Sequence, residues 1–343
     1  MLLTKDLNVI NALLFDIGGT NIRSGELVDS GNVTNIQSKR IPGELSNNTR
    51  EDIWQFLLAY ISSISKATSI EKSHPIVISF PGPIGSNNRI LSAPTLVGKT
   101  ECYPDLAEEI KDKTGRKTYI LNDISAAAWY LSTISGVSRF MVVTVSSGIG
   151  SKIYDKENRL GVLDSLPYSG EIGHIKVDLS KDALVCDCGE RGHLGAIASG
   201  RGIERTVNAF AEKEQNSFSR SLCHTQFGAV PGKIRNEDHI VPAAKMGDEW
   251  IIRNITHCTS YLSNVLSTAF MAYGLEKIFV IGGFANALSE IYLNIIKNQF
   301  TEHTRYHLIP ENIHEAIELK VEHEHAPLYG AAQYALFLSK VSE

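Results

Sequence analysis

Three glycine turns that each follow an apolar strand are the first residues in this sequence that suggest chemistry. They lie at residues 18–19, 148–150 and 282–283. Glycine after a strand allows backbone amides to approach an anion closely, as phosphate-binding loops require. Each turn taken alone could also be an ordinary hairpin turn. The dinucleotide-binding fingerprint is not met, because Thr20 stands where it needs a second glycine, and a Walker A loop is missing.

A second group of residues has the types and the spacing of a metal site. Cys186 and Cys188 are separated by one residue, His193 follows after four more, and His174 lies upstream. Tetrahedral zinc binds such a set of two cysteines and two histidines. The alternative is a lapsed site with two free thiols and no metal. The histidines of the run 323–325 precede the last predicted helix and are interpreted as part of a solvated cap.

The elements that must position these residues alternate between strands and helices. The capping pattern from Thr49 to Asp52 precedes apolar residues at helical spacing and predicts a helix over 50–66. Residues 211–240 show no clear period and are interpreted as a loop-rich insertion. Further strands are predicted over 9–15, 75–80, 119–121, 139–145 and 277–281. Further helices are predicted over 104–113 and 245–273, and two more begin at about residues 125 and 328.

Composition limits the class of protein. The chain has 343 residues, which favours two domains at roughly 100–200 residues each. Its 43% hydrophobic and 21% charged residues are typical of a globular protein and argue against a disordered or fibrous one. The net charge of −5, without a strongly basic stretch, argues against a nucleic-acid partner.

The number of cysteines and the hydropathy of the chain indicate the cellular compartment in which the protein works. Five cysteines are too few, and odd in number, for a disulfide framework, which favours a reducing environment. No apolar run reaches the roughly 18–20 residues that cross a bilayer, and the N-terminal residues do not have the apolar core of a signal peptide. We therefore expect a cytoplasmic protein that does not act on a membrane.

Seven short motifs follow one another along the chain. They are Asp16-Ile17-Gly18-Gly19-Thr20-Asn21, Pro81-Gly82-Pro83, Leu121-Asn122-Asp123, the run from Thr144 to Gly150, Gly170-Glu171-Ile172-Gly173-His174, Cys186-Asp187-Cys188-Gly189 and Val280-Ile281-Gly282-Gly283. In this order and spacing they resemble the ROK family of sugar kinases and repressors, part of the actin, sugar-kinase and heat-shock ATPase superfold. The resemblance extends over residues 12–335.

The resemblance implies an α/β architecture of two domains. The expected fold is the actin-like ATPase (ribonuclease H-like) fold, with the active site in the cleft between the domains. The expected small domain contains residues 1–122 plus 327–343, and the large domain contains residues 123–326. Kinases of this family are commonly oligomeric, so a homodimer or homotetramer is expected.

The resemblance also implies a role for each motif in phosphoryl transfer from ATP. Asp123 is implied to be the base that accepts the proton of the acceptor hydroxyl, a task that suits a carboxylate at a helix N-terminus. Asp16 is implied to hold Mg²⁺, through water. The residues implied to contact the nucleotide are Gly18, Gly19, Thr20, Asn21, Ser146, Ser147, Gly148, Gly282 and Gly283. Those implied to contact the sugar are Gly82, Asn122, Asp123, Glu171 and His174. Without the other motifs, Asp16 could be a turn residue and Asp123 an N-cap.

Three positions depart from the family pattern. His193 replaces the third cysteine of a site formed by one histidine and three cysteines, so the metal site changes from a net charge of −1 to neutral, which zinc tolerates. The zinc would be structural, holding the loop that carries Glu171 and His174. Gly195 stands where the family has a glutamate that binds the sugar, and Thr95 stands where it has an asparagine. We therefore expect an altered sugar pocket in which glucose is a poor substrate.

The sequence thus predicts an ATP- and Mg²⁺-dependent kinase that phosphorylates a primary hydroxyl of a hexose, an amino sugar or a sugar-like cyclitol. The alternative is a non-catalytic, sugar-sensing ROK protein. A ROK regulator carries a winged helix-turn-helix before the first motif, and only 15 residues precede Asp16, so a DNA-binding domain is not expected. An oxidoreductase is excluded mainly by the failed glycine fingerprint.

Overall fold

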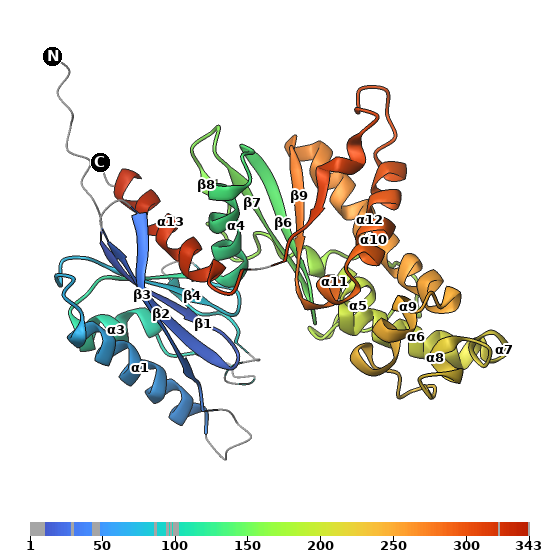
Figure 1. The fold of residues 1–343 in the computed structure, drawn as a ribbon, viewed down its shortest axis with the longest axis horizontal. Helices are drawn as coiled ribbons and strands as arrows, with labels where there is room; N and C mark the ends of the chain where they lie inside the picture. Colours follow the sequence, from blue (N-terminus) through green and yellow to red (C-terminus); the bar gives the residue numbers. More distant parts are fainter. Residues whose placement is uncertain are drawn as a thin grey trace. The chain divides into compact units, whose positions relative to one another are not determined.

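The computed structural model describes residues 11–28, 31–42, 49–85, 88–93, 96, 98, 103–321 and 323–341. The predicted departure at Thr95 lies outside these residues. The chain forms two compact units (Figure 1). The first contains residues 1–136, 159–169 and 323–343, and the second contains residues 137–158 and 170–322. The predicted domain boundary between residues 122 and 123 stays a prediction, because a division by compactness does not show which segments move together.

A five-stranded mixed sheet forms the centre of the first unit, in the order β3-β2-β1-β4-β5. Its strands are β1 (Ala12–Ile17), β2 (Asn21–Val28), β3 (Asn32–Arg40), β4 (Ile76–Phe80) and β5 (Thr118–Asn122). The strands β4 and β5 run parallel to β1, whereas β2 and β3 form an antiparallel meander with it. Every residue of β1 and β4 is buried, which is typical of a parallel sheet with helices on both faces.

Helices cover both faces of this sheet (Figure 1). They are α1 (Arg50–Ala67), α3 (Leu106–Thr114), α4 (Asp123–Ile134) and α13 (Ala326–Val341), and the two-residue strand β8 (Gly161–Val162) also lies within this unit. The predicted helix over 50–66 is confirmed as α1, and Thr49 and Asp52 form its capping box. Gly330 lets α13 pack closely on α4, because a Cβ at this position would lie 1.9 Å from the Ala126 carbonyl oxygen.

The second unit repeats the strand pattern of the first. Its strands are β6 (Arg139–Val145), β7 (Ile149–Asp155), β9 (Lys277–Ile281) and β10 (Ile317–Leu319). With the short strand β8 at one edge they form a five-stranded sheet in the order β10-β9-β6-β7-β8. A tight turn joins β6 to the antiparallel β7, and β9 and β10 are parallel to β6. This arrangement matches that of β1, β2 and β4 in the first unit.

The helices of the second unit pack around one hydrophobic core. They are α5 (Leu194–Ala198), α6 (Gly200–Lys213), α7 (Gln215–Phe218), α8 (Leu222–Thr225), α9 (Val241–Lys245), α10 (Glu249–Tyr273), α11 (Gly283–Leu288) and α12 (Glu290–His303), with the short turns η4 (Ile172–His174), η5 (Asn236–Ile240) and η6 (Ile313–Ala316). No helix in the described part of the chain is long and apolar enough to cross a membrane.

The interpretation of residues 211–240 as a loop-rich insertion is wrong. This segment contains α7, α8 and η5, and Phe218, Cys223 and Ile234 are buried in the core. These helices are about one turn long, so they are too short to show a helical period, and tertiary packing stabilises them. The predicted helix over 245–273 is interrupted at Gly247, whose φ of +81° separates α9 from α10.

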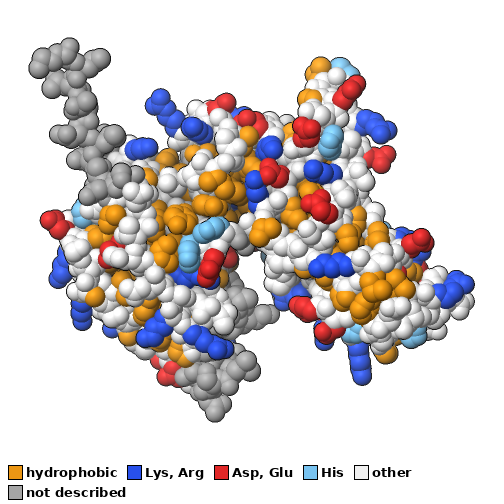
Figure 2. All heavy atoms as spheres, in the orientation of Figure 1, with side chains coloured by type: hydrophobic (Ala, Val, Ile, Leu, Met, Phe, Trp, Pro, Cys, Tyr) orange, Lys and Arg blue, Asp and Glu red, His pale blue; other side chains and the backbone are white. Residues whose placement is uncertain are grey.

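Charged side chains of both signs are interspersed on the face shown in Figure 2. The described residues on this face show no large basic patch, which agrees with the net charge of −5.

Candidate active site

Four of the predicted site residues of the first unit lie at the ends of neighbouring parallel strands. Asp16 lies near the end of β1, Gly82 follows β4, and Asn122 and Asp123 stand at the junction of β5 and α4. The strand register pairs Asp16 with Ser79 and Phe80 with Asn122, so these ends lie at one edge of the sheet. Ligands of open α/β sheets bind at this kind of edge.

Hydrogen bonds hold the junction of β5 and α4 in place. The Asn122 side chain donates to the Gly82 carbonyl at 2.8 Å and accepts from the Ile124 amide at 2.9 Å. Asn122 is therefore the N-cap of α4, and Asp123 is the exposed first residue of the helix. Gly82 has a φ of +147°, and a Cβ there would lie 2.0 Å from the Ser92 carbonyl oxygen, so only glycine fits.

Asp16 is a carboxylate with 5% of its surface exposed. The Arg23 guanidinium contacts it at 3.0 Å. Burial raises the pKa of Asp16, and Arg23 and the more distant His325 only partly offset this effect. A divalent cation at this carboxylate would favour its charged form, so a magnesium ligand fits this environment.

His325 lies closer to this edge than the sequence indicated. The run 323–325 was expected to form a solvated cap, and His323 and Glu324 are exposed. His325 is half-buried at the start of α13, and its Nδ1 is buried without a hydrogen-bond partner in the described structure. The interpretation is therefore right for two of the three residues and wrong for His325, which the packing of α13 onto β1 draws inward.

The turn between β6 and β7 is the corresponding feature of the second unit. The Ser146 amide donates to the Gly148 carbonyl at 3.0 Å, which closes the turn. The N-terminus of α6 abuts it, because the Gly200 amide donates to the Ser146 carbonyl at 2.8 Å. A Cβ at Gly200 would lie 2.8 Å from the same oxygen, so glycine permits this close approach. Turn amides and a helix N-terminus together suit an anion.

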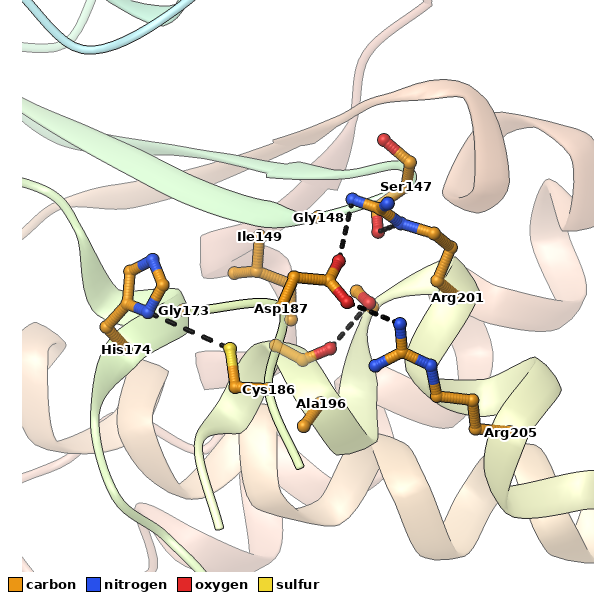
Figure 3. A pocket seen from close by; sticks show the side chains of 12 residues that line it. Ser147, Gly148, Ile149, Gly173, His174, Cys186, Asp187, Ala196, Arg201 and Arg205 are labelled. Carbon is orange, nitrogen blue, oxygen red and sulfur yellow. Dashed lines mark hydrogen bonds and ion pairs between the residues drawn. The ribbon is translucent and has the colours of Figure 1, made fainter. Parts of the chain in front are cut away.

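Two cavities border this turn. One has a volume of about 350 Å³ and is lined by Ser146, Ser147, Asn236, Gly283 and Phe284, among others. The other has a volume of about 140 Å³ and is lined by Gly195, among others. Figure 3 shows Gly148 and His174 in its lining. Both therefore contain residues that the sequence analysis singled out.

The predicted metal ligands are brought together. The ligand atoms of His174, Cys186, Cys188 and His193 all lie within 4.8 Å of one another. The two histidine Nδ1 atoms are 3.4 Å apart, Cys188 Sγ is 3.3 Å from His193 Nδ1, and Cys186 Sγ is 3.9 Å from His174 Nδ1. A tetrahedral zinc ion with ordinary bond lengths needs ligand separations of about 3.3–3.8 Å.

The chemistry of this cluster also fits zinc. Burial raises the pKa of the Cys186 thiol, so a cation is needed to stabilise the thiolate at neutral pH. His174 directs Nδ1 toward the cluster, which places its Nε2 on the opposite side of the ring. The residues present therefore fit a closed, structural zinc site.

Gly195 lies beside the segment that carries Glu171 and His174. A Cβ at Gly195 would be 3.2 Å from the Gly173 carbonyl oxygen. Gly173 is itself confined, because its Cβ would be 2.3 Å from the Ile149 carbonyl oxygen. A larger residue at position 195 therefore requires a small local shift.

The predicted site residues fall into two groups. Those at Asp16 to Asn21, Gly82, Asn122 and Asp123 belong to the first unit, and those at Ser146 to Gly148, Glu171, His174 and Gly282 to Gly283 belong to the second. The sequence analysis missed Arg23 beside Asp16, and Asp187 and Arg201 beside the second turn. Arg23 lies opposite Asp16 in the hairpin of β1 and β2, so the strand register is the signal that could have found it. The contact between Asp187 and Arg201 joins separate segments and carries no local signal in the sequence.

Comparison with known proteins identifies the family. The sequence model of the ROK family matches residues 13–337. The chain belongs to the ROK family. Among curated relatives, a C(7)-cyclitol 7-kinase from Streptomyces hygroscopicus subsp. jinggangensis is 33% identical over 83% of this chain and 82% of its own length. A glucokinase from Thermotoga maritima is 25% identical over 79% and 81%.

Solved structures of ROK proteins have the same fold. The ROK hexokinase from Thermus thermophilus superposes with a TM-score of 0.72 at 20% identity, covering 97% of this chain and 100% of the other. A ROK glucokinase from Streptomyces griseus, in complex with glucose and AMPPNP, has a TM-score of 0.66 at 21% identity, with coverages of 94% and 98%. The predicted two-domain, actin-like ROK fold is thereby confirmed.

Proposed function

We propose that this ROK protein is an ATP- and Mg²⁺-dependent kinase, and that among hexoses, amino sugars and sugar-like cyclitols it phosphorylates the primary hydroxyl of a cyclitol. The observation that carries the cyclitol assignment is Gly195, which stands where the family has a sugar-binding glutamate. The 33% identity to C(7)-cyclitol 7-kinases supports the same choice.

In the proposed reaction, residues of the first unit act on the acceptor and on the metal. Asp123 accepts the proton of the acceptor hydroxyl as that oxygen attacks the γ-phosphate of ATP. Its exposed position at the first turn of α4 supports this role, since the partial positive charge of a helix N-terminus favours a negatively charged group there. Asp16 holds Mg²⁺, which neutralises phosphate charge when bound. Gly18 to Asn21 offer amides and the Thr20 hydroxyl to the phosphates.

Residues of the second unit hold the nucleotide in this proposal. The turn from Ser146 to Gly148 binds phosphate oxygens, and the cavity of about 350 Å³ beside Gly283 accommodates adenosine. An unsatisfied atom supports this assignment: Asn236 Oδ1 is buried without a hydrogen-bond partner in the described structure and belongs to a residue that lines the cavity. An adenine amino group could donate a hydrogen bond to it.

Acceptor recognition is assigned to polar groups of both units: Gly82, Asn122 and Asp123, with Glu171 and His174. A glutamate at position 195 would accept hydrogen bonds from two ring hydroxyls, and such charge-assisted bonds contribute about 1.5–3 kcal/mol. Glycine removes this hydrogen-bond acceptor, so a substrate that differs from glucose at these hydroxyls is favoured. Glucose should therefore have a kcat/KM lower than that of the preferred substrate by roughly 10- to 150-fold.

A coupled ADP-release assay across hexoses, N-acetylated hexosamines and C7 cyclitols tests the proposal. We expect turnover that depends on Mg²⁺ and is fastest with a cyclitol. Asp123→Asn provides the catalytic control, and it should lower kcat by roughly 100-fold or more. Because Asn122 is the N-cap, α4 should remain folded in this variant. Binding of a cyclitol without ADP release would instead identify a non-catalytic sensor.

Two variants at position 195 test the basis of specificity. Gly195→Glu restores the carboxylate, and Gly195→Ala introduces the same Cβ contact with the Gly173 carbonyl without it. Improved glucose turnover in Gly195→Glu but not in Gly195→Ala would support the assignment. Efficient glucose turnover by the unmodified protein would contradict it.

A further inference from the structure

An ionic bridge joins the metal-binding loop to the turn between β6 and β7. Asp187, between Cys186 and Cys188, contacts Arg201 Nη2 at 3.1 Å through one carboxylate oxygen and Arg205 Nη2 at 2.5 Å through the other. Both arginines come from the first two turns of α6. Arg201 Nε also donates to the Ser147 carbonyl at 3.0 Å (Figure 3). A continuous path thus connects a cysteine loop with the proposed phosphate-binding turn.

The contact with Ser147 matters because a peptide group is planar. The Ser147 carbonyl and the Gly148 amide belong to the same trans peptide and point in opposite directions. A donor that holds the carbonyl therefore sets the direction of the amide. A Cβ at Gly148 would meet no heavy atom within 4 Å, so neighbouring side chains do not confine this peptide by packing against that residue.

Each end of the bridge is also anchored to the backbone. Arg205 Nη1 donates to the Val185 carbonyl at 3.2 Å, on the residue before Cys186. The Gly200 amide holds the start of α6 against the Ser146 carbonyl. The side chains of Arg201 and Asp187 are 56% and 46% exposed, so the ion pair by itself contributes little to stability. The ion pair instead fixes the direction in which the Arg201 side chain points.

We propose that Asp187 and Arg201 couple the metal loop to the nucleotide, with Arg201 as a positioning residue that aligns the Gly148 amide for a phosphate oxygen. This inference rests on the proposed function, because it takes the turn as a phosphate site and the cluster as a zinc site. When the metal holds the loop, Asp187 is fixed, and it orients Arg201 toward Ser147. When the loop is loose, Arg201 loses that orientation and the peptide turns more freely.

Coupling between two ligands is reciprocal. If bound metal strengthens nucleotide binding through this bridge, bound nucleotide must retain the metal to the same extent. At equilibrium with a chromogenic chelator, the zinc-loaded protein should therefore retain more of its zinc in the presence of MgADP. Removal of zinc should in turn raise the dissociation constant of MgADP.

The experiment compares five proteins by zinc release and by MgADP calorimetry. They are the unmodified protein, Asp187→Asn, Arg201→Lys, Arg205→Gln and the control Arg253→Gln, which removes an exposed arginine of α10 that pairs with Glu214. In the unmodified protein and in Arg253→Gln we expect MgADP to reduce the amount of zinc transferred to the chelator at equilibrium. Asp187→Asn and Arg201→Lys should still bind close to one zinc, but should raise the MgADP dissociation constant by roughly 2- to 30-fold and abolish the protection. Arg205→Gln should have the smaller effect, since it does not reach Ser147.

The lysine variant separates positioning from direct charge. A lysine at position 201 would keep the positive charge but cannot hold Asp187 and the Ser147 carbonyl with one planar fork. If Arg201→Lys binds MgADP normally, or if Asp187→Asn changes neither the affinity nor the zinc protection, the coupling is refuted. Protein that takes up no zinc also refutes it. Failure of the unmodified protein to bind MgADP at all would instead overturn the proposed function.

Steady-state kinetics provide a second readout. The variants at positions 187 and 201 should raise the KM for ATP while leaving kcat and the KM of the acceptor within about twofold. A merely structural role would lower the melting temperature without this selective change. An equal increase in the KM values of ATP and of the acceptor would contradict the assignment.

Discussion

Asp16 is a buried residue whose charged form is destabilised by its surroundings. Its burial raises the pKa from the ordinary value of 3.8, even though Arg23 contacts it. The folded state therefore binds this proton more tightly than the unfolded state does. The free energy of unfolding should decrease as the pH rises from about 3.8 to the pKa of the folded protein and then level off.

We predict that Asp16→Asn separates stability from activity. The neutral amide avoids the cost of burying a charge, so the melting temperature at pH 7 should be unchanged or higher. The decrease in the free energy of unfolding with rising pH that Asp16 causes should be lost. Turnover should become undetectable, because the magnesium ligand is gone. Scanning calorimetry from about pH 4 to pH 8, with the ADP-release assay, measures both effects. A variant that retains Mg²⁺-dependent turnover would exclude Asp16 as the metal ligand.

At the scale of elements, Arg116 links α1 to the start of β4. Its side chain is 1% exposed. The guanidinium donates to Ser65 Oγ at 2.9 Å and to the carbonyls of Ile70, Glu71 and His74 at 2.5, 2.6 and 3.1 Å. One buried guanidinium thus holds three carbonyls of the segment between α1 and β4, so this arginine organises that connection.

We predict that Arg116→Gln lowers the free energy of unfolding by about 3–5 kcal/mol, because the four hydrogen bonds of a buried guanidinium are lost together. The exposed variant Arg253→Gln should change it by less than about 1 kcal/mol. Urea denaturation measures both values. Hydrogen exchange should increase first in residues 65–75, and a uniform increase over both units would contradict the local role.

The metal-binding loop is the second element whose structure depends on a few ligands. We predict close to one zinc per chain, lost together with stability in Cys186→Ser. The informative control is His193→Cys, which restores three thiolates and should retain zinc while returning the site to a net charge of −1. Elemental analysis and thermal unfolding measure both. If protein purified without chelators holds no zinc and takes none up, the site has lapsed.

At the scale of the whole molecule, the proposed catalytic residues are divided between two compact units. Asp123 belongs to the first, and the turn from Ser146 to Gly148 belongs to the second. Transfer requires the acceptor hydroxyl and the γ-phosphate to come within reach of each other, with water excluded. The predicted active site between domains therefore implies closure when both ligands bind.

We predict that acceptor and a non-hydrolysable ATP analogue together reduce the radius of gyration and slow proteolysis between the units, whereas the nucleotide alone has a smaller effect. Small-angle scattering and limited proteolysis measure these changes. If neither quantity changes with both ligands, closure is not part of the reaction cycle.

Features that depend on neighbouring residues could be predicted from the sequence. The apolar runs before Asp16 and Asp123 predicted β1 and β5, and the capping box predicted α1, because burial and helix capping act over a few residues. The four metal ligands were predicted because they lie close together in the chain and their spacing suits tetrahedral zinc. The order of the motifs was enough to predict the family.

Features that join distant segments emerge only when the elements pack together. The helices between residues 211 and 240 are stabilised by the core that α10 also lines, so their sequence carries no period. His325 is drawn toward Asp16, far from it in sequence, by the packing of α13 on the first sheet. Asp187 is an ordinary polar residue in the sequence, and it becomes a bridge because α6 places Arg201 and Arg205 beside it. Such contacts depend on how elements pack, and packing between elements leaves no local pattern in the sequence.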